Sequence, residues 1–184
     1  GVVEQCGMCS DAVLVASVFF FNVPATTEIY PLSLHDALLI SLFDGIDLTA
    51  ISVSLTINPS AWILYAMYIA LARRRGYDLN ALSGTIQADI LKEYVAQKEW
   101  IFPIRPSVRL VRDCIAFGAE HMRRYNPVNI SGYHISEAGA TPVQEAAFTM
   151  ANTIAYVEEL VKAGIDVDSF EIGRAHLCTP VTSP

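Results

Sequence analysis

Residues 51–57, ISVSLTI, alternate strictly between aliphatic and hydroxyl side chains, and this period of two predicts a β-strand. Alternate side chains point to opposite sides of a sheet, so the two faces of this strand would differ in chemistry. Ser52, Ser54 and Thr56 would share one face, and only aliphatic residues would share the other.

The chain directly after this strand predicts a helix. Asn58 followed by Pro59 is typical of an N-cap and a first helical residue. The apolar stretch that follows keeps a helical pattern up to Gly76, which is placed to end the helix.

Further strands and helices alternate along the rest of the chain. Residues 82–87 and 128–135 predict two short strands, and residues 88–97 and 107–122 predict helices. In the second of these helices, one face would be apolar. That face consists of Val108, Val111, Ile115 and Met122.

A long helix is predicted near the end of the chain. Residues 141–144, TPVQ, form a capping box with a proline in the first turn, and Gly164 would close the helix. We expect one apolar face of this helix to pack against the rest of the protein. That face consists of Val143, Ala146, Ala147, Met150, Ile154, Val157 and Val161.

The order strand-helix-strand-helix-strand-helix predicts an α/β fold with a parallel sheet. Three βα units are too few for a closed (β/α)₈ TIM barrel, so the chain would form either a small open sheet or part of such a barrel. Ordinary barrels fill their interior with bulky branched side chains, and a hydroxyl face turned inward would leave a hollow interior instead. The alternative is an edge strand whose hydroxyl face is exposed to water. We expect a partial barrel of about three units.

Composition narrows the class of protein. The chain has 184 residues, 53% of them hydrophobic and 17% charged, which suits one domain whose elements are covered on more than one face. A net charge of −7 without a basic stripe argues against nucleic-acid binding. The apolar residues 12–23 are too few to span a bilayer. Cys6 and Cys9 form a CxxC without a second pair, so we expect no metal site.

Two stretches at the ends of the chain resemble peptides that arise when sequencing-adapter DNA is translated. They are residues 28–41, EIYPLSLHDALLIS, and residues 171–184, EIGRAHLCTPVTSP. We therefore expect residues 1–40 and 171–184 to be foreign, and residues 41–170 to be a segment of one larger barrel domain. The alternative is a genuine N-terminal arm.

In either α/β architecture the functional site lies at the carboxyl ends of the strands. Asn58, residues 85–87 and Tyr133-His134 would lie there. Gln87 has amide hydrogens and neutral His134 has one N–H, so both could donate to one carbonyl oxygen. The pattern alone leaves open whether His134 does chemistry or is a buried residue satisfied by the backbone. GxSxG, HExxH, P-loop and GxGxxG motifs are absent from the sequence.

Two long motifs carry a resemblance to a known family. GTIQADILKEYVAQKEWIFPIRPSVRLVRD and NISGYHISEAGATPVQEAAFTMANTIAYV resemble the large subunit of the cobalamin-dependent acyl-CoA mutases, the methylmalonyl-CoA mutase family, over residues 41–170. The resemblance implies a (β/α)₈ barrel along whose axis acyl-CoA passes, lined by Ser52, Ser54 and Thr56. It implies a radical rearrangement of the carbon skeleton, in which adenosylcobalamin supplies the difficult chemistry.

The resemblance also implies roles for single residues. His134 and Gln87 would bind the thioester carbonyl, and Tyr133 would pack beside the cofactor and assist homolysis. Other positions would contact the substrate or the corrin ring. Thr85, Ile86, Gln97 and Arg124 would contact the acyl-CoA, and Ala96 and Glu137 would contact the corrin ring.

Gln97 departs from the methylmalonyl-CoA mutases, which have an arginine there to bind the free carboxylate of the substrate. A neutral amide cannot form that charge-assisted bidentate pair. We therefore expect a substrate without a second carboxylate, isobutyryl-CoA or 2-hydroxyisobutyryl-CoA. The alternatives are a methylmalonyl-CoA mutase that tolerates Gln97 and an inactive truncated α/β segment.

The resemblance also implies partners. The DxHxxG segment, whose histidine binds cobalt in this family, is not in the sequence, and the favoured branches carry it on a separate small subunit. We therefore expect a cobalamin-binding small subunit or domain as partner, an oligomeric, cytoplasmic enzyme in full-length form, and no membrane.

Overall fold

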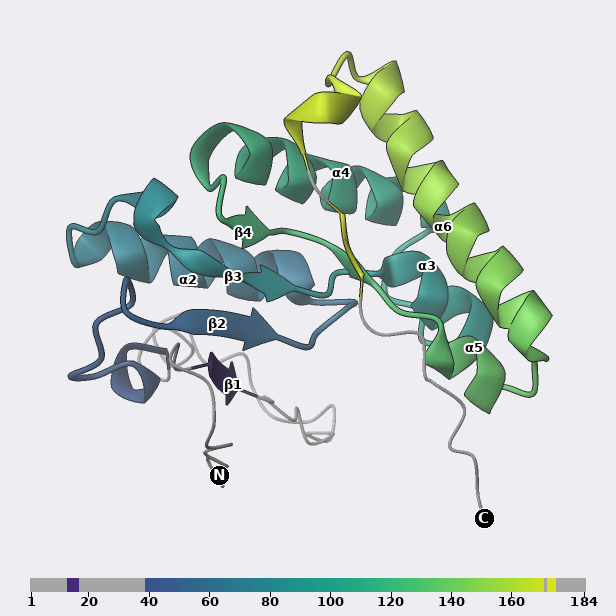
Figure 1. The fold of residues 1–184 in the computed structure, drawn as a ribbon, viewed down its shortest axis with the longest axis horizontal. Coiled ribbons are helices and arrows are strands. Elements are labelled where there is room, and N and C mark those ends of the chain that lie inside the picture. The colour runs from purple at the N-terminus through teal and green to yellow at the C-terminus, as the bar shows by residue number, and fades with distance from the viewer. Residues whose placement is uncertain (1–12, 17–38, 171, 175–184) are drawn as a thin grey trace.

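The computed structural model describes residues 13–16, 39–170 and 172–174, and it confirms an α/β fold with a parallel sheet (Figure 1). The strands are β1 (Val13–Ala16), β2 (Ser52–Leu55), β3 (Ser83–Ile86), β4 (Tyr125–Asn126), β5 (Asn129–Ile130) and β6 (Gly173–Arg174). The α-helices are α2 (Ala61–Arg74), α3 (Ile90–Lys92), α4 (Ile104–His121), α5 (Tyr133–Glu137) and α6 (Pro142–Lys162). Leu79–Ala81 and Val167–Ser169 form short 3₁₀ helices η1 and η3, and Glu93–Gln97 forms a π-helix, η2.

The main sheet has the order β1-β2-β3-β4, and every neighbouring pair is parallel. A second parallel pair joins β5 and β6. Pro127, which has no N–H for a ladder, separates β4 from β5. Beyond it, the Asn129 amide donates to the Gln87 carbonyl at 2.8 Å, so β5 continues beside the end of β3.

The strand predicted for residues 128–135 is wrong beyond Ile130, because the chain turns there into helix α5. Gly132 lies at this turn with ordinary helical dihedral angles, and what it provides is space for the neighbouring helix α6. A Cβ on Gly132 would lie 2.6 Å from Thr149 Oγ1 and 2.9 Å from Glu145 Cγ, both in α6. Only glycine permits this approach, which holds α5 against α6.

The predicted alternation of β2 is confirmed. Val53, Leu55 and Ile57 are buried in a cluster with the inner face of α2, and the side chains of the opposite face are half-buried or exposed. Full burial of each such aliphatic side chain contributes about 1.5–3 kcal/mol. A second cluster joins α3, α4, β5 and α6, and includes Tyr156 and Leu160 of α6.

Helix α2 begins two residues later than the sequence indicated. Its N-cap is Ser60, which makes no side-chain capping bond, so the assignment of Asn58 as N-cap is wrong. The Asn58 side chain instead reaches the end of β3. The end of the helix is confirmed: Gly76 takes a left-handed φ of 77°.

Helix α6 has the predicted capping box, in which Thr141 and Gln144 bond to each other's backbone amides. Its predicted buried face is wrong. Val143 and Met150 are 79% and 60% exposed, and Glu145, Tyr156 and Leu160 are buried in their place. The helix is oriented by its contacts with α4, α5 and β5, which select a different face.

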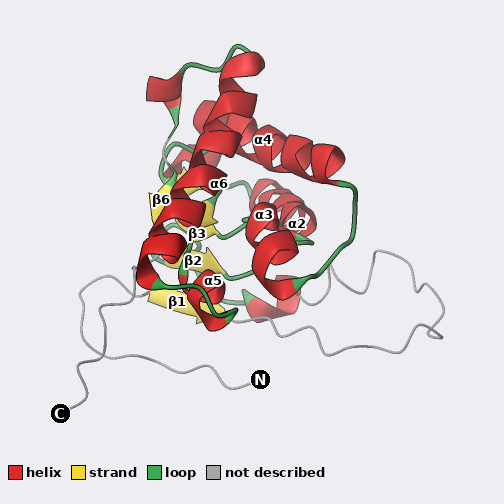
Figure 2. Ribbon diagram, turned by 90° about the vertical axis from the view of Figure 1, so that its right-hand side faces the viewer, coloured by secondary structure: helices red, strands yellow, loops and turns green. Residues whose placement is uncertain are grey.

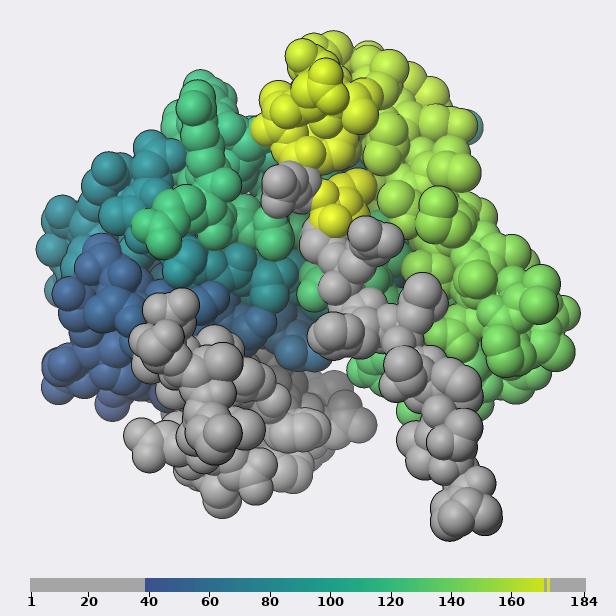
Figure 3. Space-filling view, viewed as in Figure 1, coloured from purple at the N-terminus to yellow at the C-terminus, as the bar shows by residue number. Residues whose placement is uncertain are grey.

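The predicted helix 88–97 is divided into α3 and η2, and α4 begins three residues earlier than predicted, with its expected apolar face buried. Figure 2 shows α2, α3 and α4 to one side of the strands, and both views place α5 and α6 beyond the carboxyl ends of β2 and β3. In the space-filling view, α6 and η3 form one edge of the molecule and the region of β2 and α2 the other (Figure 3).

Candidate active site

The candidate site lies at the carboxyl ends of β2 and β3, beyond which helix α5 lies (Figures 1 and 2). Asn58 follows β2, Gln87 follows β3, and His134 is in the first turn of α5. Ala88 turns the chain after Gln87 with a left-handed φ of 49°, a conformation that costs a non-glycine residue about 1 kcal/mol. Backbone strain of this kind is found at functional sites.

Gln87 is held by three hydrogen bonds. Its Oε1 accepts from Asn58 Nδ2 at 3.0 Å and from Lys92 Nζ at 2.8 Å, and its Nε2 donates to Ser131 Oγ at 3.2 Å. The side chain is only 7% exposed. These contacts fix which end of the amide donates, and they leave the second Nε2 hydrogen for another acceptor.

His134 lies beside the same serine. Its Nδ1 is 3.4 Å from Ser131 Oγ, and its ring centroid is 3.6 Å from that of Tyr133. Burial, followed by the positive charge of Lys92, lowers the pKa of His134 to about 4. At neutral pH the imidazole is therefore uncharged and has one N–H to donate. Ser131 thus brings Gln87 and His134 together.

Lys92 was not among the residues predicted for the site. It is fully buried, and its Nζ also donates to Ser131 Oγ at 3.4 Å. Burial lowers the pKa of Lys92, and the charges of Asp89 and Glu93 oppose that shift. The signal in the sequence was a lysine five residues after Gln87, flanked by two acids in an otherwise apolar helix.

Asp89 connects this group to helix α6. The Tyr156 hydroxyl donates to Asp89 Oδ1 at 2.9 Å and accepts from the Leu91 amide at 2.9 Å. Burial raises the pKa of Asp89, although Lys92 and the Tyr156 hydroxyl counteract this. A residue 67 positions further along the chain therefore fixes the loop that carries Gln87.

A row of polar side chains leads to the site along the sheet. Ser54 is in register with Thr85, and Thr85 with Asn126, so the three share one face across β2, β3 and β4. Thr85 Oγ1 is buried and has no hydrogen-bond partner among the described residues. Ser52 and Thr56 continue this face along β2. The side chain of Ile86 points the other way, into the core, so only its backbone borders the site.

The remaining predicted positions lie around the site or far from it. The half-buried Ala96 and the exposed Gln97 are in η2, which contacts α5, and Glu137 is exposed at the end of α5. With its amide nitrogen toward Glu93, Gln97 hydrogen-bonds that carboxylate. Arg124 is exposed just before β4, at the amino end of the strands, and the structure does not bring it to the site.

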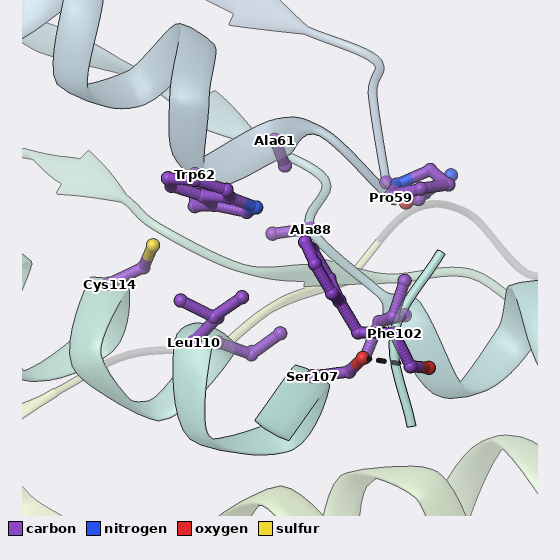
Figure 4. Close-up of a pocket in the computed structure, with 11 residues that line it drawn as sticks. Pro59, Ala61, Trp62, Ala88, Phe102, Ser107, Leu110 and Cys114 are labelled. Atoms are coloured by element: carbon purple, nitrogen blue, oxygen red, sulfur yellow. Dashed lines mark hydrogen bonds between the residues drawn. The ribbon is translucent and has the colours of Figure 1, made fainter. Parts of the chain in front are cut away.

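A small pocket adjoins the site on the helix side of the sheet, and Asn58 and Ala88 are among its lining residues. Trp62, Leu110 and Cys114 border it, and Ser107 hydrogen-bonds the Phe102 carbonyl at its rim (Figure 4). Burial raises the pKa of the Cys114 thiol to about 12, which leaves no thiolate for nucleophilic chemistry. The pocket therefore offers packing surface rather than reactive groups.

Within residues 13–16, 39–170 and 172–174, no three His, Cys, Asp or Glu side chains gather as they would around a metal ion. None of the helices described is long and apolar enough to cross a membrane. Cys6 and Cys9 lie outside the described residues.

A neutral imidazole and an oriented amide lie together at the carboxyl ends of parallel strands, and each has an N–H that it can donate. The chain belongs to the methylmalonyl-CoA mutase family, whose family model, described as Methylmalonyl-CoA mutase, matches residues 33–174. The members of this family that the chain resembles are acyl-CoA mutases, which are isomerases.

Three relatives illustrate the range of the family. The 2-hydroxyisobutanoyl-CoA mutase large subunit of Aquincola tertiaricarbonis is 68% identical over 130 residues, 71% of this chain and 23% of the relative. Methylmalonyl-CoA mutase of Escherichia coli (strain K12) and the methylmalonyl-CoA mutase large subunit of Streptomyces virginiae are each 45% identical over 129 residues, 70% of this chain and 18% of each relative. The chain thus spans about a quarter or less of the length of these relatives.

Proposed function

We propose that this chain is a segment of the large subunit of an adenosylcobalamin-dependent acyl-CoA mutase, and that it contributes about three units of a (β/α)₈ barrel. One observation carries the proposal: Gln87 and His134 both contact Ser131 at the carboxyl ends of parallel strands. The hydroxyl face of Ser52, Ser54 and Thr56 supports the barrel, because small polar side chains would leave room for an acyl-CoA along its axis.

In this site the thioester oxygen would accept two hydrogen bonds. Gln87 would donate its second Nε2 hydrogen, and neutral His134 would donate its single N–H. Both groups are almost fully buried, so their dipoles act with little screening by water on the charge that develops as the acyl group migrates. Thr85 Oγ1, buried without a partner among the described residues, supports a further polar contact with the substrate.

The residues around the site suit the periphery of a corrin ring. Ala96, Tyr133 and Glu137, from the adjoining η2 and α5, combine a small, an aromatic and an acidic side chain at the end of the barrel. Bound adenosylcobalamin would supply radical chemistry through homolysis of its cobalt–carbon bond. Tyr133, with its ring close to that of His134, would exclude water between the cofactor and the substrate carbonyl. The cobalt-binding histidine would come from a small subunit or domain.

Gln97 supports a substrate with a neutral, hydroxylated acyl group. When its amide nitrogen bonds Glu93, its oxygen is the atom left to face a ligand. That oxygen can accept from a hydroxyl, and it repels a carboxylate. We therefore infer 2-hydroxyisobutyryl-CoA as the substrate, in agreement with the name of the relative at 68% identity, and isobutyryl-CoA as the second candidate.

The rest of the proposal concerns the full-length protein. It would act in the cytoplasm, in an oligomer that includes the cobalamin-binding small subunit. Arg124, at the amino ends of the strands, would meet the CoA moiety, because a substrate threaded along the barrel axis reaches both ends.

The proposal is tested by assaying the full-length large subunit with its small subunit on 2-hydroxyisobutyryl-CoA, isobutyryl-CoA and methylmalonyl-CoA. We expect the enzyme to turn over 2-hydroxyisobutyryl-CoA with a much higher kcat/KM than methylmalonyl-CoA. A similar kcat/KM on the two substrates would contradict the substrate assignment. His134→Ala should lower kcat by about 100- to 1,000-fold, as loss of one carbonyl-binding donor does. A His134→Ala enzyme with unchanged kcat and weakened CoA binding would refute the carbonyl role.

A further inference from the structure

We propose that a one-way chain of hydrogen bonds fixes His134 in the tautomer that carries its proton on Nε2, and that Lys92 is the positioning residue that sets this direction. The chain runs from the Asp89 amide through Asn58, Gln87 and Ser131 to His134. The use of the resulting Nε2–H on a substrate carbonyl rests on the proposed function, whereas the tautomer itself does not.

The direction is set at the start of the chain by groups that can only donate. The backbone N–H of Asp89 donates to Asn58 Oδ1 at 3.1 Å, which leaves Asn58 Nδ2 to donate to Gln87 Oε1. The Lys92 ammonium, which has three donors and no acceptor, bonds the same Gln87 oxygen at 2.8 Å. Gln87 must therefore present its nitrogen to Ser131.

Ser131 passes this direction on because its acceptor sites are both filled. A hydroxyl oxygen accepts two hydrogen bonds and donates one. Gln87 Nε2 donates to Ser131 Oγ at 3.2 Å, and Lys92 Nζ donates to the same oxygen at 3.4 Å. The hydroxyl hydrogen is the one group left for the next contact, His134 Nδ1 at 3.4 Å.

An imidazole that accepts at Nδ1 carries its proton on Nε2, because neutral histidine has one donor and one acceptor nitrogen. Without Lys92, Ser131 would keep a free lone pair, and His134 Nδ1–H could donate to it in the opposite tautomer. Lys92 thus acts through Ser131. The same contacts keep the Gln87 amide in the orientation that leaves a donor free.

The tautomer can be measured directly by ¹⁵N NMR of the full-length protein with labelled histidine, using His134→Gln to assign the signals. We expect Nε2 of His134 to be protonated and Nδ1 to be unprotonated at pH 7.5. Lys92→Met and Ser131→Ala should each shift the population toward Nδ1–H, and Lys92→Arg, which keeps the donors, should restore Nε2–H. Ser136→Ala, in the same helix but bonded to the Tyr133 carbonyl, is the matched control and should change nothing.

Kinetics give a second readout. Ser131→Ala should lower kcat about tenfold and leave KM for acyl-CoA nearly unchanged, because a network residue orients the donor without binding CoA. A wild-type protein with Nδ1 protonated, or unchanged tautomers in both Lys92→Met and Ser131→Ala, would overturn the proposal. A protein with the expected tautomers but no mutase activity would leave this inference standing and refute the proposed function instead.

Discussion

Replacing Gln97 with arginine tests how the site selects its acyl group. Gln97 is exposed at the end of η2, and with its amide nitrogen turned toward the Glu93 carboxylate its oxygen is the group offered to a ligand. Arginine removes that acceptor and introduces a charged, bidentate donor. A substrate with a free carboxylate should then gain a partner, and a hydroxylated substrate should lose one.

The size of the change follows from the exposure of the position. A hydrogen bond to a charged group contributes about 1.5–3 kcal/mol, and each 1.4 kcal/mol is about a tenfold change. Position 97 is open to solvent and Glu93 competes for the new guanidinium, so the lower end of this range of hydrogen-bond energies applies. We expect Gln97→Arg to raise kcat/KM for methylmalonyl-CoA by about 10- to 30-fold, and to lower it for 2-hydroxyisobutyryl-CoA by about tenfold.

The assay is steady-state turnover of both thioesters by the full-length enzyme with its small subunit. Gln97→Met is the control, since it removes the acceptor and adds no charge. It should lose efficiency on 2-hydroxyisobutyryl-CoA and gain none on methylmalonyl-CoA. Our reasoning fails if Gln97→Arg gains nothing on the dicarboxylic substrate, or if Gln97→Met still prefers the hydroxylated one.

Three further predictions concern the full-length protein. His134 should titrate by NMR near pH 4 rather than 6.5; its folded-state pKa is the lower one, so its contribution to stability is complete above pH 6.5 and is lost as the pH falls toward 4, and a midpoint near 6.5 would contradict its burial. Tyr156→Phe removes the hydrogen bond that the hydroxyl donates to the fully buried Asp89 and the one that it accepts from the Leu91 amide, and should cost about 2–3 kcal/mol in denaturant unfolding. A loss below about 0.5 kcal/mol, typical of an exposed substitution, would show that these bonds do not stabilise the fold. Gly84→Ala would place a Cβ 2.1 Å from the Val53 carbonyl oxygen and should cost about 3 kcal/mol or more, so a variant of unchanged melting temperature would contradict the packing of β2 on β3.

The elements that the sequence predicted well are those whose signals are local. The alternation of residues 51–57 and the capping box at Thr141 depend on near neighbours, and both are confirmed. Gln87 and His134 were expected to lie close together because parallel strands end at one edge, and they share a contact with Ser131.

The parts that the sequence did not predict depend on distant partners. Asn58 has the local signature of an N-cap, but its side chain finds better-placed groups 29 and 31 residues away. Residues 133–135 continue an apolar pattern, but they form the start of α5, which packs against α6 where Gly132 approaches that helix. Lys92 resembles a surface lysine, and only the meeting of two strands and α5 shows it to be buried.

Ser54, Thr85 and Asn126 form a row of short polar side chains across β2, β3 and β4, and none of the three is a large aliphatic residue. A long flexible ligand that lay along this polar face would bring its reactive end to the donors at the carboxyl ends of the strands. Selectivity for the length of the ligand would then depend on the length of the strands, whereas selectivity for its reactive end would depend on a few side chains around the donors. A bulky residue introduced anywhere in this row would block the binding of such a ligand, even though the residue contacted neither donor.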